Sequence, residues 1–179
     1  MIPQPEREQI VALINREVVP AIGCTEPIAV ALCVAKATEI LGTEPERIVA
    51  RLSANILKNA MGVGIPGTGM IGLPIAIALG ALIGKSAYRL EVLRDVDAEA
   101  VARGKRYVDE KRITIGLKEG IEEKLYIEIE AAAGDHTAVA VIAGGHTNFV
   151  FEARDGQSQL DRRGASAGEE EQNLSLIHI

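Results

Sequence analysis

The pattern of apolar residues changes once along this 179-residue chain, and that change most constrains the fold. Up to residue 111 apolar side chains recur at helical spacing or form long apolar stretches, whereas beyond it they alternate with polar ones. The alternating segments are 112–117, 124–131, 137–143 and 147–153, with an earlier one at 46–54. Helices followed by a run of strands predict an α+β fold: N-terminal helices that flank a glycine-rich loop, then a mainly antiparallel sheet of about four to five strands.

The helical part of the chain has recognisable ends. Apolar spacing predicts a helix over 5–19, and a second, almost wholly apolar one runs from Pro27 to a stop at Gly42. The apolar stretch 71–84 contains Pro74 and is shorter than the roughly 20 residues of a membrane span. We therefore predict a buried helix there, a charged exposed helix over 97–111, and no membrane association.

Composition narrows the class of protein. The chain has 25 acidic and 19 basic residues, a net charge of −6 and only 3% aromatic residues, which argues against nucleic-acid binding. Its two cysteines cannot form a disulfide framework or a self-contained four-cysteine metal site. Charged residues interrupt the N-terminal segment, so it does not resemble a signal peptide, and we expect a cytoplasmic protein with reduced thiols.

The predicted domain organisation has two parts. Residues 1–156 carry all of the periodic pattern, whereas 157–179 are acidic, lack an apolar period and are expected to be disordered. The last six residues, Leu-Ser-Leu-Ile-His-Ile, resemble translated adaptor sequence, so we expect the tail to be non-native.

Cys24 lies just before a predicted helix, within Gly-Cys-Thr-Glu-Pro. The unpaired N–H groups and the dipole of a helix N-terminus favour a thiolate, which a nucleophile or a metal ligand requires. The alternative is a small residue that fills the helix start. Cys33 follows nine residues later, on the opposite side of a helix that turns about 100° per residue, and is expected to pack in the core.

The segment 53–72 is rich in glycine and contains two overlapping G-x-G-x-x-G patterns. Polar residues separate the preceding strand from the glycines and Pro66 stiffens the loop, so a dinucleotide site is disfavoured. A small anion such as a carboxylate suits it better. Lys58 is a candidate base or Schiff-base lysine, or an ordinary surface charge. The other candidate carboxylate-binding residues are Asn55, Asn59, Gly62, Gly64, Gly67, Thr68 and Gly69.

Two histidines, His136 and His146, lie at or near the starts of two successive predicted strands. They could form a catalytic or ligand pair, although a single loop histidine is more often simply solvated.

Together, residues 23–27, the motif Ser-Ala-Asn-Ile-Leu-Lys-Asn-Ala-Met-Gly-Val-Gly-Ile-Pro-Gly-Thr-Gly (53–69) and His146-Thr-Asn resemble the L-cysteine desulfidase family, which is related to the iron–sulfur L-serine dehydratase alpha chain. The resemblance covers about 8–156 and only the N-terminal part of that family's longer chain. It implies a lyase in which three cysteines hold a [4Fe–4S] cluster that acts as a Lewis acid on a small amino acid. Cys24 would be one ligand, and the role of His146 stays open.

The departure from the family is that the other cluster cysteines are absent, and Cys33 does not replace them. We therefore expect an N-terminal fragment that is inactive alone and lacks its C-terminal half. A partner chain with the missing cysteines, or a homo-oligomer, is an alternative arrangement. Two other functions stay open: a pyridoxal phosphate lyase that uses Lys58, and a non-catalytic module that binds an amino acid.

Overall fold

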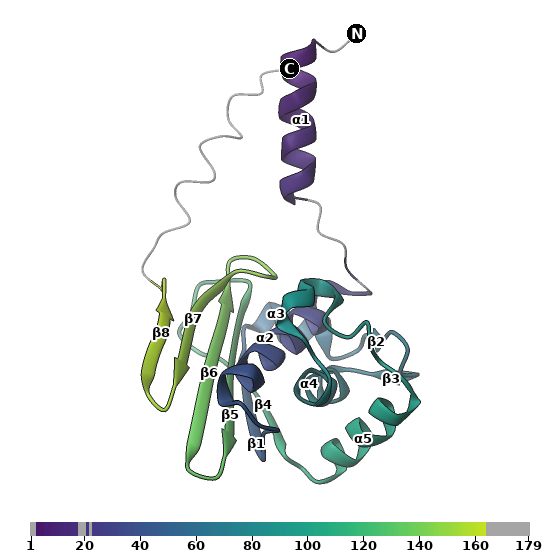
Figure 1. Ribbon diagram of the computed structural model, residues 1–179, viewed down its shortest axis with the longest axis vertical. Helices are drawn as coiled ribbons and strands as arrows, with labels where there is room; N and C mark the ends of the chain where they lie inside the picture. The colour runs from purple at the N-terminus through teal and green to yellow at the C-terminus, as the bar shows by residue number, and fades with distance from the viewer. Residues whose placement is uncertain (1–2, 18–20, 22, 164–179) are drawn as a thin grey trace.

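A six-stranded sheet with helices packed on one face forms the centre of the computed structural model, which describes residues 3–17, 21 and 23–163 (Figure 1). The fold is α+β, as predicted. In chain order the elements are α1 (Gln4–Glu17), α2 (Thr25–Leu41), β1 (Arg47–Leu52), α3 (Ala54–Ala60), β2 (Gly64–Ile65), β3 (Met70–Ile71), α4 (Leu73–Leu82), the 3-10 helix η1 (Ser86–Glu91), α5 (Ala98–Asp109), β4 (Ile113–Leu117), β5 (Tyr126–Ala133), β6 (His136–Ala143), β7 (Phe149–Arg154) and β8 (Gln157–Asp161).

The strands lie in the order β4-β1-β5-β6-β7-β8. Four of the five pairings are antiparallel, but β1 and β4 are parallel, with Ile48 opposite Ile113. The sheet is therefore mainly antiparallel and larger than the four to five strands expected. The parallel pair arises because the helices between β1 and β4 return the chain to its starting end, a crossover that parallel strands require.

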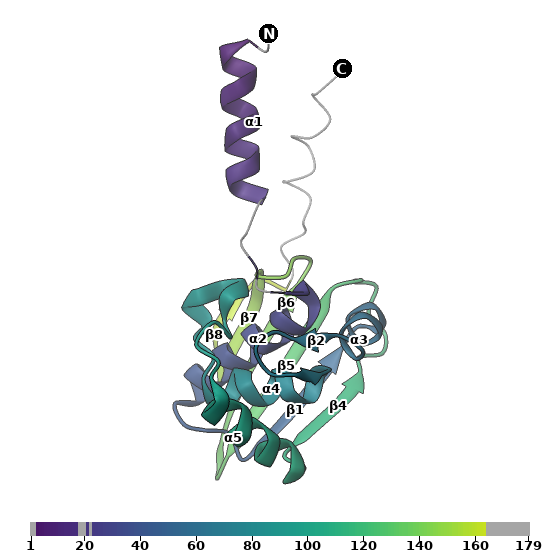
Figure 2. The ribbon, with the colours of Figure 1, turned by 90° about the vertical axis from the view of Figure 1, so that its right-hand side faces the viewer.

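Helix α2 packs directly on β5 and β6, α4 packs on α2, and α5 packs on α4 (Figures 1 and 2). A Cβ added to Gly80 of α4 would lie 2.6 Å from the Ala31 carbonyl oxygen of α2, so the two helices approach through backbone atoms. Helix α2 ends as predicted at Gly42, whose φ of 81° lets its N–H bond the Thr38 carbonyl. Cys33 is fully buried in this layer, with its Sγ 3.3 Å from the Ala140 carbonyl oxygen, as expected for a core residue.

Two expectations are corrected by the described residues. The predicted loop over 55–72 instead contains α3 and a two-stranded hairpin, β2–β3. The tail expected to be disordered from 157 begins with a strand, because β8 pairs with β7 from Gln157 to Asp161. A polar edge strand with few apolar residues has no sequence signal that separates it from a tail. The rest of that prediction, over 164–179, lies outside the described residues.

The opposite face of the sheet carries a polar network centred on Glu128 in β5. Its carboxylate accepts hydrogen bonds from Arg51 at 2.8 Å, from Lys118 at 2.7 Å and from the Tyr126 hydroxyl at 2.7 Å. Burial alone would raise the pKa of Glu128, but the three donors outweigh it and hold the pKa below its ordinary value. Among the described helices, none is both long and apolar enough to cross a membrane.

Candidate functional site

Helix α2 begins with a pair of side chains that contact each other. Cys24 is the N-cap residue in an extended conformation, and its thiol donates a hydrogen bond to Glu26 Oε2 at 2.9 Å. The Thr25 hydroxyl donates to the same oxygen at 3.3 Å. Cys24 makes no side-chain cap bond to the helix. The first turn therefore presents a thiol and a carboxylate beside N–H groups that no N-cap side chain satisfies.

The protonation of this pair differs from the sequence-based expectation. The hydrogen bond to Glu26, followed by burial, raises the pKa of the Cys24 thiol above its ordinary value. The same hydrogen bond, with a smaller contribution from the charge of His146, holds the pKa of Glu26 below its usual range. The direction of the Cys24 pKa is opposite to the one that the helix dipole alone favours, because an adjacent carboxylate opposes the dipole.

His146 lies in the connection between β6 and β7, and its charge contributes to the lowered pKa of Glu26. That connection is closed by Asn148, whose side chain donates to the Ala143 carbonyl at 2.9 Å and whose N–H donates to the Gly145 carbonyl at 3.1 Å. His146 is half-buried, and it is close enough to Glu26 to influence its pKa. Thiol, carboxylate and imidazole therefore lie at one end of the fold; we call Cys24, Glu26 and His146 the α2 cluster.

His136 does not pair with His146. It begins β6, whereas His146 follows the end of that eight-residue strand, so the two lie on the order of 20 Å apart at a rise of about 3.3 Å per residue. At its own end, His136 Nδ1 lies 3.0 Å from an Asp155 carboxylate oxygen. The expected histidine pair is excluded because neighbouring antiparallel strands begin at opposite ends of a sheet.

The glycine-rich motif meets the start of α2 through the β2–β3 hairpin. A Cβ at Gly23 would lie 2.6 Å from Pro66 Cγ, and one at Gly67 would lie 2.7 Å from Val96 Cγ1. Both glycines have positive φ, 90° and 76°. The hairpin turn therefore packs between the α2 start and the segment after η1, and glycine is needed there for space as well as for conformation.

Thr68 acts within this hairpin. Its buried hydroxyl donates to the Ile65 carbonyl at 2.7 Å and accepts the Met70 N–H at 2.9 Å. The one hydroxyl proton is thus committed to the turn, and Thr68 does not offer the ligand a donor as expected. The carboxylate-binding role of Gly62, Gly64, Gly67 and Gly69 stays a prediction.

The polar residues of α3 lie on its exposed side. Asn55, Lys58 and Asn59 are all exposed, and the Asn59 amide donates to Asn55 Oδ1 at 3.5 Å. Among the described residues, no hydrogen bond or ion pair joins any of the three to Cys24 or Glu26. An exposed lysine on a seven-residue helix lacks the desolvated surroundings that a Schiff-base lysine usually has.

Two residues at this end of the fold, Glu26 and Arg89, are not predicted as functional candidates by the sequence. For Glu26 the available signal is its two-residue spacing from Cys24. Arg89 gave no signal: it lies in η1 with φ 51° and ψ −126°, and its Nη2 donates to the Thr147 hydroxyl at 2.9 Å. In the part of the chain that the structure describes, no three His, Cys, Asp or Glu side chains form a metal-binding group.

The fold and the α2 cluster define an α+β chain with a polar, thiol-containing site at one end of its sheet. The chain is similar to UPF0597 proteins: it is 68% identical to one from Phocaeicola vulgatus over 99% of this chain, and 66% identical to BF3560 of Bacteroides fragilis over 97% of this chain. A UPF0597 protein of Oleidesulfovibrio alaskensis is 44% identical over 87%. These matches cover 42%, 40% and 36% of the relatives, so the chain spans about two fifths of their length. No protein-family model matches the chain, and no solved structure does.

Proposed function

We propose that this chain is the N-terminal part of a [4Fe–4S]-dependent lyase that eliminates sulfide from L-cysteine, or water from L-serine. The observation that carries the proposal is the meeting of three separate motifs at one end of the fold. Gly23 contacts Pro66 of the glycine-rich hairpin, and Glu26 beside Cys24 is influenced by His146. Those motifs are the ones on which the resemblance to the desulfidase family rests.

This chain can supply one of the cysteine ligands of such a cluster. Cys24 is half-buried and lies at a helix start with unsatisfied N–H groups, which suits a ligand to an anionic sulfide cluster. Cys33 is fully buried between α2 and the sheet and cannot serve. The remaining ligands are assigned to the three fifths of the relatives that this chain does not span. When bound, the cluster would supply an iron Lewis acid that polarises the leaving group.

Two side chains of this chain, Glu26 and His146, would assist a cluster held by Cys24. Glu26, which accepts the Cys24 thiol hydrogen bond, is placed to receive that proton when Cys24 becomes a ligand. His146 is the better candidate for removing the α-proton, because its charge acts on Glu26, the partner of the proposed ligand Cys24, whereas Lys58 lies exposed on α3. Loss of the leaving group would give aminoacrylate, which hydrolyses to pyruvate and ammonia. An oxygen-sensitive cluster also favours the cytoplasm as its compartment.

The test uses a hybrid in which this chain replaces the matching 42% of the Phocaeicola vulgatus relative. The hybrid is reconstituted anaerobically with iron and sulfide, and the formation of pyruvate from L-cysteine and from L-serine is followed. We expect pyruvate from at least one substrate in the hybrid, and none from this chain treated alone. A hybrid that takes up a full cluster but forms no pyruvate from either amino acid would contradict the lyase proposal. Turnover by this chain alone would contradict its role as a fragment.

A non-catalytic amino-acid-binding module is the second candidate, and it is favoured by the Cys24 thiol being hydrogen-bonded to Glu26, an arrangement that needs no metal. That function predicts unchanged amino-acid affinity in Cys24→Ser. The pyridoxal phosphate alternative requires Lys58, and borohydride trapping of the cofactor on that residue would identify it.

A further inference from the structure

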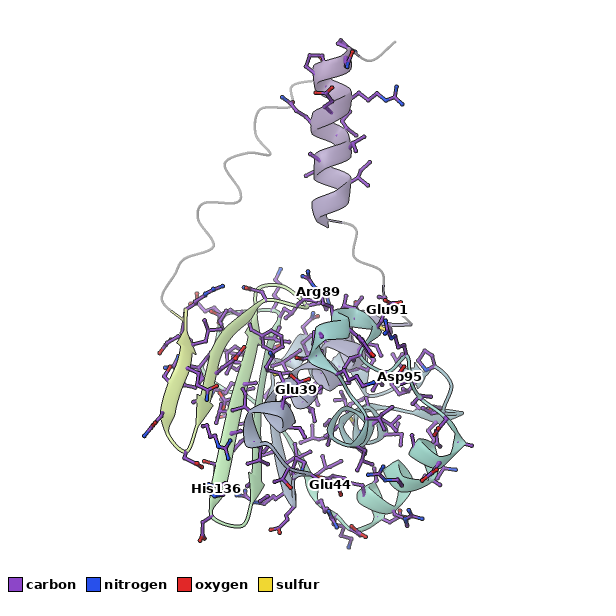
Figure 3. All side chains as sticks on the ribbon, in the orientation of Figure 1. Glu39, Glu44, Arg89, Glu91, Asp95 and His136 are labelled. Atoms are coloured by element: carbon purple, nitrogen blue, oxygen red, sulfur yellow. The ribbon has the colours of Figure 1, made fainter. Side chains whose placement is uncertain are left out.

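Helix α1 stands apart from the rest of the fold. In Figures 1 and 2 it projects beyond one end of the sheet, and Figure 3 shows its side chains extending to more than one side with no other described element beside them. Among the described residues, no helix or strand packs extensively against α1. By contrast, α2, α4 and α5 each bury part of their surface. The described fold therefore leaves α1 without a packing partner.

The side chains of α1 include an exposed apolar face. Over residues 4–14 every side chain is exposed except Leu13, which is half-buried. Ile10, Val11 and Ile14 are 40%, 48% and 50% exposed. They are three of the six large apolar side chains that the described part of the chain leaves exposed, so half of that exposure lies on one helix. Ile10 and Ile14 lie about one turn apart and thus share one side of α1.

A helix of this length gains little stability from its own hydrogen bonds. Isolated helices shorter than about 12–15 residues are marginal in water, and most helices in proteins are stabilised by the packing of an apolar face. Helix α1 has 14 residues, and within residues 3–17, 21 and 23–163 no element covers its apolar face. A stable α1 therefore requires a surface from outside this part of the chain.

The relatives indicate which surface that is. The match to the Phocaeicola vulgatus protein covers 99% of this chain, and so includes α1, but it covers only 42% of the relative. The relatives thus carry the α1 segment together with a longer stretch of chain that is absent here. We propose that α1 docks through Ile10, Val11 and Ile14 in an apolar groove formed by the three fifths of the relatives that this chain does not span. The proposal rests on the fragment part of the proposed function and is independent of the lyase chemistry.

The size of α1 favours a groove on the same polypeptide over a separate molecule. One face of a 14-residue helix is about 21 Å long and about 10 Å wide, or about 200 Å². A stable interface between two proteins buries about 800 Å² on each partner, and a coiled coil needs about three to four heptads, whereas α1 spans two. A groove on the same chain needs less area, because the covalent link raises its effective concentration.

The charge of α1 disfavours a membrane surface as the occupant. Its 14 residues include three acidic and two basic side chains. Helices that lie on membranes carry Lys and Arg on their polar face and are attracted to anionic lipids. A helix with net negative charge lacks that attraction, so a protein groove suits α1 better.

Hydrogen–deuterium exchange of the α1 amides tests the proposal. It is measured in this chain alone, in the hybrid with the Phocaeicola vulgatus relative, and in that relative itself. We expect residues 4–17 to exchange at nearly the rate of an unfolded peptide in this chain, because an uncovered helix opens readily. In the hybrid and in the relative, the same segment should exchange at least about tenfold more slowly. Equal protection of α2 and β5 in this chain and in the hybrid shows that the shared part is folded in both.

Two matched variants of the hybrid locate the docking face. Ile14→Asp places a charge on the apolar face and should return α1 to the fast exchange of this chain alone. Ala12→Asp is the control, because Ala12 is exposed and lies on nearly the opposite side of the helix. Its substitution costs more helix propensity than Ile14→Asp does, so a purely local effect would be larger in the control. We expect Ala12→Asp to keep the protection of α1.

The proposal is overturned if α1 exchanges as fast in the hybrid and in the relative as in this chain, or if Ala12→Asp removes the protection as fully as Ile14→Asp. Protection in this chain alone that rises with protein concentration would identify a second copy as the occupant. Protection of this chain by vesicles of phosphatidylcholine and phosphatidylglycerol would identify a membrane, and either result would overturn the proposal. A protected α1 in a hybrid that forms no pyruvate would leave this inference standing while the lyase proposal failed. Pyruvate formation with an unprotected α1 would overturn this inference alone.

Discussion

The middle and the start of α2 are built on different principles. In the middle, Cys33 is fully buried and Ala31 lies against the backbone of Gly80, so each atom is fixed by packing. At the start, Cys24 and Glu26 are half-exposed and bound to each other by a polar contact. One helix thus supplies both the core and the candidate site, and the same residue type has a different role in each region.

Among the variants that test this comparison, we expect Gly80→Ala to change the free energy of unfolding most. The new methyl group would lie 2.6 Å from the Ala31 carbonyl oxygen, a backbone atom that cannot move aside. We expect a loss of about 1–3 kcal/mol in the free energy of unfolding, despite the better helix propensity of alanine. Urea unfolding measures it. Gly104→Ala is the control, because its methyl would meet only side-chain atoms, the flexible end of Ile75 at 2.9 Å and Leu79 at 3.3 Å, and should cost less. Equal stability of the two variants would show that the helices are not in backbone contact.

The second prediction compares the two cysteines directly. Cys33→Ser places a hydroxyl in an apolar interior and should cost about 1–2 kcal/mol of stability. Cys24→Ser keeps the hydrogen bond to Glu26 at a half-exposed site and should change stability by less than about 0.5 kcal/mol. Chemical denaturation of both variants side by side tests the difference, and a larger loss in Cys24→Ser would reverse the assignment of the two regions.

A third, pH-dependent effect concerns the outer face of the sheet. Burial opposes ionisation of Glu128, yet its three donors hold its pKa in the folded chain below the unfolded value of about 4.3. Its contribution to stability is therefore fully present above that value and is lost as pH falls through the lower, folded-state pKa. Glu128→Gln should cost about 1 kcal/mol at neutral pH and remove this part of the acid dependence. Parallel curves of unfolding free energy against pH for wild type and variant would argue against the network.

The sequence predicts the elements that local patterns determine, and it misses those that depend on long-range contacts. Local periodicity and a glycine stop were enough for α2, α4 and most strands. The parallel β1–β4 pair depends on a crossover of some sixty residues, and the hairpin around Thr68 depends on contacts with Gly23 and Val96. These are tertiary contacts, which a local sequence pattern does not predict.

The site was predictable to a smaller extent. Cys24 and His146 were recognised by motif, but the direction of the Cys24 pKa was not, because the helix dipole was weighed without the Glu26 carboxylate. Arg89 could not be found from sequence, since nothing in its neighbours predicts a positive φ.

The central claim, that Cys24 is a cluster ligand and Cys33 is not, is tested most directly by counting iron in the anaerobically reconstituted hybrid. We predict four iron atoms per chain in the hybrid and in Cys33→Ser, provided that the latter is folded, as expected for one [4Fe–4S] cluster. Cys24→Ser should fold normally and retain little or no iron. Full iron content in Cys24→Ser would contradict the account.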